Sequence, residues 1–166
     1  MAALVHVAAG FAAKPLGERV PVGILVVGAA FLDLLAMAFS YAGFERNGSI
    51  PWSHGLLMSI GWSAAMFVLS SLVSRSRRVG LVTGLLVLSH WVIDFITHPM
   101  GAVFGGQPLP PDLPLLFDGS PKVGLGLYNS SIGAASAIEF GAMAAGLAIY
   151  VVYTVRRRRR AAPRGA

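Results

Sequence analysis

Three ionisable side chains recur every four residues near the end of a long apolar stretch. His90, Asp94 and His98 lie in the segment Ser89–His98, and in a helix this spacing places them on one face as neighbours. A carboxylate between two imidazoles is costly inside hydrocarbon unless something compensates it. A divalent cation, a proton shared with a partner or a water-filled cavity would each do so. The pattern therefore indicates a functional site.

The overall composition places this site in a membrane protein. The chain of 166 residues is 55% hydrophobic and 12% charged, whereas soluble domains contain about 25% charged residues. Its length favours a single domain. Cysteine is absent, which excludes thiolate zinc sites, thiol nucleophiles and disulfides. Any metal must therefore be held by His, Asp, Glu or backbone oxygen.

Four apolar segments approach or exceed the roughly 20 residues that cross a bilayer as a helix. These segments are Val22–Tyr41, Ser53–Ser74, Val79–Thr97 and Ser131–Val155. The first segment, Met1–Ala13, is shorter and is expected to form a half-helix, a re-entrant piece or a short tilted helix. The predicted fold class is all-α: a polytopic bundle of four transmembrane helices plus a short N-terminal helix, with five spans if that helix also crosses. Residues 1–155 form this one domain.

The basic residues predict the orientation of the bundle. Most of them fall on one side if the loop containing Arg75 is cytoplasmic, as the positive-inside rule requires. That group is Lys14, Arg19, Arg75, Arg77, Arg78, Arg156, Arg157, Arg158, Arg159, Arg160 and Arg164, leaving Arg46 and Lys122 outside. Residues 156–166 are then a basic cytoplasmic tail, attracted to anionic headgroups. Because the basic clusters flank apolar spans, no nucleic-acid partner is expected.

In this orientation the ionisable groups within the apolar segments share one layer of the membrane. At a rise of about 1.5 Å per residue, Asp33 and His90 lie roughly 12 Å below the outer face and Asp94 roughly 6 Å below it. The complete set in the outer half is His6, Asp33, His54, His90, Asp94, His98 and Glu139. His6 reaches this layer if its segment starts outside. Residues 99–130 form an exterior loop above the layer, predicted to lack regular structure and to act as a lid or substrate-access element, or as a plain tether.

Several short motifs run in order along most of the chain. They are Leu4–His6, Phe11–Lys14, Phe31–Leu35, Gly43–Glu45, Pro51–Leu57, Leu88–Asp94, Asp112–Leu115 and Lys122–Ser130. In these motifs the chain resembles the bacterial inner-membrane metal-dependent hydrolases, which are similar to the SOS-regulated membrane-associated hydrolases. The resemblance implies a multi-pass protein of the bacterial inner membrane. It also implies a metal-binding set of His6, Asp33, His54, His90 and Asp94.

The chain departs from the family pattern at two places. Leu34 and Leu35 follow Asp33 where relatives often carry a second acidic residue or a histidine, which could cost a second metal. Gly55 follows His54 where serine is usual, which removes a hydroxyl near the site.

The function predicted from these residues is a membrane-embedded, metal-dependent hydrolase. Its substrate is expected to be a lipid or lipid-linked ester or phosphoester near the outer face, attacked by water that the metal activates. The metal is expected to be Zn²⁺, or Mn²⁺ or Fe²⁺ with octahedral coordination. Catalytic roles are assigned to Asp33, His54 and Glu139, the last as a carboxylate that orients a ligand histidine or, alternatively, as a protonated packing residue. Membrane lipids are the expected partners, and an oligomer is compatible with the sequence.

Two other functions remain open from the sequence. The same His and Asp groups could serve a non-enzymatic binding protein or a proton- or cation-coupled carrier, which would need polar groups continuing into the cytoplasmic half. Alternatively, His90 and Asp94 form a buried pair that only specifies how helices pack.

Overall fold

The computed structural model describes residues 3–45, 50–101, 106–129 and 131–161. Seven helices occur in these ranges: α1 (Ala3–Ala12), α2 (Val22–Ala29), α3 (Phe31–Ala42), α4 (Pro51–His54), α5 (Leu56–Ser74), α6 (Arg77–Thr97) and α7 (Ile132–Ala161). The chain is predominantly helical, as its sequence predicts. Arg46 and Arg164, which were used to predict the orientation, lie outside the described residues.

Three of the helices are long and apolar enough to cross a membrane: α5, α6 and α7. The predicted span Val22–Tyr41 is not one straight helix, because α2 and α3 meet at a bend of 58°. This bent pair brings the number of candidate spans to four if it counts as one span. Many large apolar side chains on these helices are exposed, among them Leu69, Leu72 and Leu81, as expected of surfaces that face lipid.

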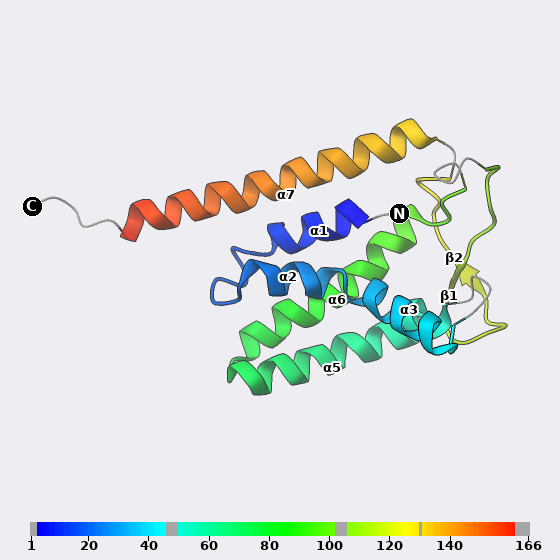
Figure 1. The fold of residues 1–166 in the computed structure, drawn as a ribbon, viewed down its shortest axis with the longest axis horizontal. Coiled ribbons are helices and arrows are strands. Elements are labelled where there is room, and N and C mark those ends of the chain that lie inside the picture. The colour runs from blue at the N-terminus through cyan, green and yellow to red at the C-terminus, as the bar shows by residue number, and fades with distance from the viewer. Residues whose placement is uncertain (1–2, 46–49, 102–105, 130, 162–166) are drawn as a thin grey trace, which may run out of the picture.

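The helices form two packed groups that meet at α2 and α6 (Figure 1). α5 and α6 make an antiparallel hairpin, while α1 packs against both α7 and α2. Two glycines allow this close packing of α1. A side chain at Gly10 would collide with the backbone of Val26 in α2, and one at Gly146 would collide with the backbone of Ala8.

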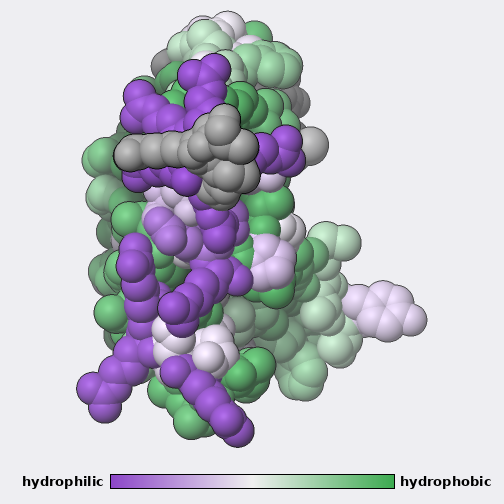
Figure 2. All heavy atoms as spheres, turned by 90° about the vertical axis from the view of Figure 1, so that its left-hand side faces the viewer, coloured by the Kyte–Doolittle hydropathy of each residue, from purple (hydrophilic) through white to green (hydrophobic). Residues whose placement is uncertain are grey.

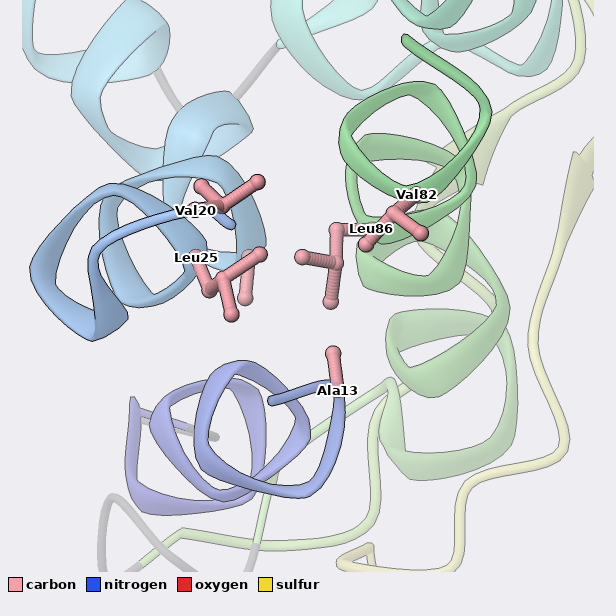
Figure 3. Close-up of a cluster of buried hydrophobic side chains, with 6 residues drawn as sticks. Ala13, Val20, Leu25, Val82 and Leu86 are labelled. Carbon is pink, nitrogen blue, oxygen red and sulfur yellow. The ribbon is translucent and has the colours of Figure 1, made fainter. Parts of the chain in front are cut away.

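An apolar cluster joins α1, α2 and α6 at the centre of the bundle (Figure 3). Its buried members are Ala13, Val20, Leu25, Ala29, Val82 and Leu86. Leu25 is completely inaccessible to solvent. This cluster fixes α2 against α6, and it places the end of α2 beside the segment of α6 that carries His90.

Most of the described basic residues gather at one end of the molecule (Figure 2), whereas Lys122 lies at the other. The basic end contains the α1–α2 connection, the turn between α5 and α6, and the arginine run near the end of α7. Arg156–Arg160 were predicted to begin a tail after a span ending at Val155, but α7 continues through them to Ala161. Arginine is a good helix former, so the helix need not stop where the apolar sequence stops.

The connection between α6 and α7 lies at the opposite end and contains two short strands. β1 (Leu113–Pro114) pairs antiparallel with β2 (Lys122–Val123), so the prediction that residues 99–130 lack regular structure is wrong at these positions. The backbone of this connection also bonds back to α6, through Leu125 N to Phe95 O at 2.7 Å. The connection is therefore attached along the end of α6.

The predicted span Ser53–Ser74 is broken at Gly55, between α4 and α5. Ser53 lies inside α4, and Gly55 is the residue that precedes α5. A side chain at Gly55 would collide with the carbonyl oxygens of Pro51 and Leu116. The tight turn after His54 therefore requires glycine.

We expect Gly55→Ala to destabilise the fold by about 1–3 kcal/mol, the usual cost of forcing atoms into a packed site. Thermal unfolding in detergent measures this change. Gly61→Ala is the matched control, because Gly61 lies within α5 and its added methyl group would meet nothing within 4 Å. An equal loss of stability in both variants would contradict the role given to Gly55.

Candidate metal centre

Four side-chain atoms from three helices converge on one point beneath the α6–α7 connection. Asp33 Oδ1 of α3 lies 3.6 Å from both His54 Nε2 of α4 and His90 Nε2 of α6. Asp94 Oδ2, also on α6, lies 3.3 Å from the first of these nitrogens and 3.4 Å from the second. All four separations exceed the roughly 2.7–3.2 Å of an N–H···O hydrogen bond. The atoms face one another without being bonded to one another.

These separations fit a cation placed between the four atoms. Nitrogen and oxygen ligands about 2.0–2.1 Å from a tetrahedral Zn²⁺ lie roughly 3.3–3.4 Å apart. His54, His90 and Asp94 offer ligand atoms within 4.8 Å of one another, and so do His6, Asp33 and His90. These buried groups could therefore hold a metal ion.

The hydrogen bond of His90 determines which of its nitrogens faces this point. His90 Nδ1 lies 2.7 Å from the carbonyl oxygen of Ala29, at the end of α2. Because a carbonyl only accepts, Nδ1–H is the donor, and in the neutral ring Nε2 then carries a lone pair. Among the described residues, His90 Nε2 and Asp94 Oδ2 are buried with no hydrogen-bond partner. Two such atoms buried face to face are unfavourable unless a metal ion or a proton lies between them.

His54 is oriented in the same way, through Ser53 and Glu45. The Ser53 hydroxyl lies 2.9 Å from Glu45 Oε2 and 2.8 Å from His54 Nδ1. It has one proton, which it donates to the Glu45 carboxylate, so it accepts from His54 Nδ1–H and, in the neutral ring, leaves Nε2 with a lone pair. Glu45 is only 2% exposed and also accepts the Ser53 N–H, at 2.7 Å. Partners of this kind fix the orientation of metal-ligating histidines.

His6 supports Asp94 and His90 from the side of α1. Its Nε2 lies 3.0 Å from Asp94 Oδ1, the carboxylate oxygen that does not face the convergence point. Its ring stacks on that of His90 at a centroid distance of 3.6 Å, with planes 3° apart. His6 therefore limits the orientations available to both side chains.

His98 lies between the α6–α7 connection and the candidate metal centre, and contacts both. Its Nδ1 lies 3.1 Å from Asp112 Oδ2, and its Nε2 lies 4.0 Å from Asp94 Oδ1. The i, i+4 relation of His98 to Asp94 therefore brings the two side chains close, as helix geometry predicts. Asp112 comes from the segment just before β1 and holds that segment against the end of α6.

Glu139 has a different environment from the one expected of a catalytic residue. Its Oε2 accepts the backbone N–H groups of Leu4 and Val5 at 2.8 and 3.1 Å, and its Oε1 accepts the Tyr128 hydroxyl at 3.0 Å. A carboxylate at a helix N-terminus stabilises that helix, so Glu139 holds the first turn of the helix that carries His6. Burial, together with Glu139, raises the pKa of Tyr128 above its ordinary value of 10.0, which keeps that phenol a hydrogen-bond donor.

Among the described residues that face the convergence point, Asp33 is the exposed one. The Asp33 side chain is 50% exposed, whereas the side chains of His54, His90 and Asp94 are at most 5% exposed. A molecule can therefore approach the convergence point beside Asp33.

The structure thus brings together His6, Asp33, His54, His90 and Asp94, the set implied by the family resemblance. Glu139 has no hydrogen bond or ion pair with any of these five among the described residues, and it bonds to α1 instead. Sequence reasoning gave no role at this site to Glu45, Ser53 or Asp112. Because Ser53 and His54 are adjacent in the sequence, a hydrogen bond between the hydroxyl and the imidazole could have been predicted. Glu45 lies beyond the end of an apolar segment, and nothing in the sequence indicated its contact with Ser53.

Comparison with known proteins gives no further assignment, because no family model, curated protein or solved structure matches this chain. The site is therefore interpreted from its own geometry.

Ser53→Ala is expected to lower zinc affinity by about 10- to 100-fold, the usual effect of removing a group that orients a metal ligand. The substitution leaves His54 Nδ1–H without its acceptor, so the ring can rotate away. Zinc titration of the detergent-purified protein against a competing chelator measures the change. Ser89→Ala is the control, since Ser89 donates to the Leu86 carbonyl within α6; an equal loss of affinity there would refute the orienting role.

Proposed function

We propose that this protein is a membrane-embedded, metal-dependent hydrolase that cleaves an ester or phosphoester bond in a lipid or lipid-linked substrate. The observation that carries the proposal is the convergence of two imidazole lone pairs and two carboxylate oxygens at separations of 3.3–3.6 Å. The resemblance to bacterial inner-membrane metal-dependent hydrolases supports the same class.

The proposed ligands are His54 Nε2, His90 Nε2 and Asp94 Oδ2, and Asp33 Oδ1 faces the fourth position, where water would bind. Zn²⁺ is the favoured ion, because the spacing of these atoms suits tetrahedral coordination, and Mn²⁺ and Fe²⁺ are the alternatives. When bound, such an ion supplies a Lewis acid that lowers the pKa of water toward about 7 and polarises a carbonyl or phosphoryl oxygen.

The remaining roles belong to residues of the chain itself. Ala29, Ser53 with Glu45, and His6 hold the three buried ligands in place through the hydrogen bonds described above. Asp33, at the opening, accepts the proton of the attacking water as general base. Glu139 positions α1 and thereby His6, so its contribution to activity is indirect.

A lipid substrate agrees with the surroundings of the opening. Asp33 lies near the start of α3, whose exposed side chains include Leu34 and Met37. These apolar groups suit an acyl chain, and they allow a lipid to approach sideways from the bilayer. We propose that the bent pair α2–α3 forms the fourth span, and that the basic end faces the cytoplasm. The metal centre is then near the exterior face of a bacterial inner membrane.

The apolar cluster between the metal centre and the basic end favours a hydrolase over an ion-coupled carrier. A carrier needs polar groups along a path through the membrane, whereas Leu25, Val82 and Leu86 pack together there. A purely structural role is disfavoured by the unpaired buried atoms of His90 and Asp94, since groups kept for packing are usually fully hydrogen-bonded.

Elemental analysis of the protein purified in detergent tests the metal site. We expect about one transition-metal ion per chain in the wild type and almost none in Asp94→Ala, because Asp94 provides a central buried ligand. Glu18→Gln, at the basic end, is expected to keep the wild-type content. Wild-type protein without stoichiometric metal, even after incubation with zinc, would refute the proposal.

Asp33→Asn is expected to retain the metal, which His54, His90 and Asp94 would hold, but to lose about 10²- to 10⁴-fold in kcat, the usual contribution of a general base. The assay is release of the headgroup or acyl product from a panel of lipids in mixed micelles. Leu34→Asn is the neighbouring control, and it should alter KM for long-chain lipids rather than kcat. Unchanged kcat in Asp33→Asn would exclude Asp33 as the base.

A further inference from the structure

A second candidate binding site lies at the basic end, far along the bundle from the metal centre. A groove of about 690 Å³ separates the last turns of α7 from the α1–α2 connection. This volume lies within the range of roughly 300–1,000 Å³ that is typical of ligand pockets. The groove exists because α7 extends past the end of α1, as Figure 1 shows.

The α7 wall of this groove changes from apolar to cationic along its length. The lining residues of α7 are Ala148, Ile149, Val152, Tyr153, Arg156, Arg157 and Arg160. From Ile149 onward they follow i, i+3, i+4, i+7, i+8 and i+11, which is one face of a helix. At a rise of about 1.5 Å per residue, this stripe is roughly 16 Å long. Its apolar part lies toward the middle of the bundle, and its guanidinium groups lie at the end.

The cationic part is available for an anionic ligand. Within the described part of the chain, no ion pair joins an arginine to a carboxylate. Glu18, on the opposite wall, is the acidic residue that lines the groove, against three arginines. Its carbonyl oxygen, rather than its carboxylate, accepts Arg157 Nη1 at 3.4 Å. The groove therefore keeps a net positive charge.

We propose that this groove binds one anionic phospholipid of the adjacent leaflet. The phosphate contacts Arg156 and Arg160, where guanidinium groups form bidentate hydrogen bonds with phosphate. The upper part of an acyl chain lies along Ile149 and Val152, which are 45% and 47% exposed. The site is separate from the proposed hydrolytic centre, and it does not depend on that function.

The test uses the full-length, delipidated protein in detergent, with lipid binding read by native mass spectrometry. Phosphatidylglycerol should bind at least about tenfold more tightly than phosphatidylcholine, because only the former has a net negative charge. Inorganic phosphate at millimolar concentration should not displace it, since the acyl contacts are missing. Equal binding of the two lipids, or displacement by inorganic phosphate alone, would overturn the proposal.

The arginine run provides a matched pair of variants with the same loss of charge. Arg156→Ala/Arg160→Ala should weaken phosphatidylglycerol binding by about tenfold or more, whereas Arg158→Ala/Arg159→Ala, outside the groove, should weaken it by less than about threefold. Equal losses of affinity in the two double variants would mean that the lipid is attracted to basic charge in general, and would overturn the proposed site. Val152→Trp, which fills the groove without changing charge, should also abolish preferential binding; wild-type binding in this variant would refute the acyl contact. Thermal unfolding in detergent verifies that each variant is folded.

Discussion

The hydrogen bond from His90 to the carbonyl of Ala29 is the interaction on which the candidate metal centre depends. In the neutral imidazole it places the proton on Nδ1, so that the lone pair of Nε2 faces two carboxylate oxygens. The Ser53–Glu45 pair does the same for His54. Four electron-rich atoms therefore meet in a largely buried space, where mutual repulsion is weakly screened. A cation at their centre would make this arrangement favourable. The hydrogen bonds of His90 and His54 use the ring nitrogens that face away from the site, so the nitrogens that face it stay available to the cation.

Two interruptions of the helices make this geometry available. The bend between α2 and α3 presents the Ala29 carbonyl to His90 and turns Asp33 toward the same point, while the break at Gly55 allows α4 to deliver His54. Irregular backbone at membrane depth is tolerated only where protein buries it or where it lines a cavity. At the other end, the apolar cluster of α1, α2 and α6 holds the helices that carry these interruptions. The breaks and the cluster thus act together to position ligands that are far apart in sequence.

Much of this arrangement could be predicted from the sequence, for reasons that also explain the failures. The i, i+4 spacing of His90 and Asp94 needs only a helix, and the placement of Asp33 and His54 in the same half of the bundle needs only span boundaries and rise per residue. The bend at Ala30 could not be predicted, because neither proline nor glycine occupies the junction. Glu45 was missed because its role depends on the chain folding back onto α4. Glu139 was predicted to lie in the same layer as the other ionisable groups, but this placement could not show that its carboxylate faces the N-terminus of α1.

X-ray absorption spectroscopy of the zinc-loaded protein tests the central claim most directly, because it reports the atoms that surround the metal. The geometry predicts four nitrogen and oxygen neighbours at about 2.0–2.1 Å. The outer-shell scattering of imidazole rings should be present, and it should weaken in His90→Ala. A spectrum with oxygen neighbours alone, lacking imidazole scattering and unchanged by His90→Ala, would contradict the proposed centre.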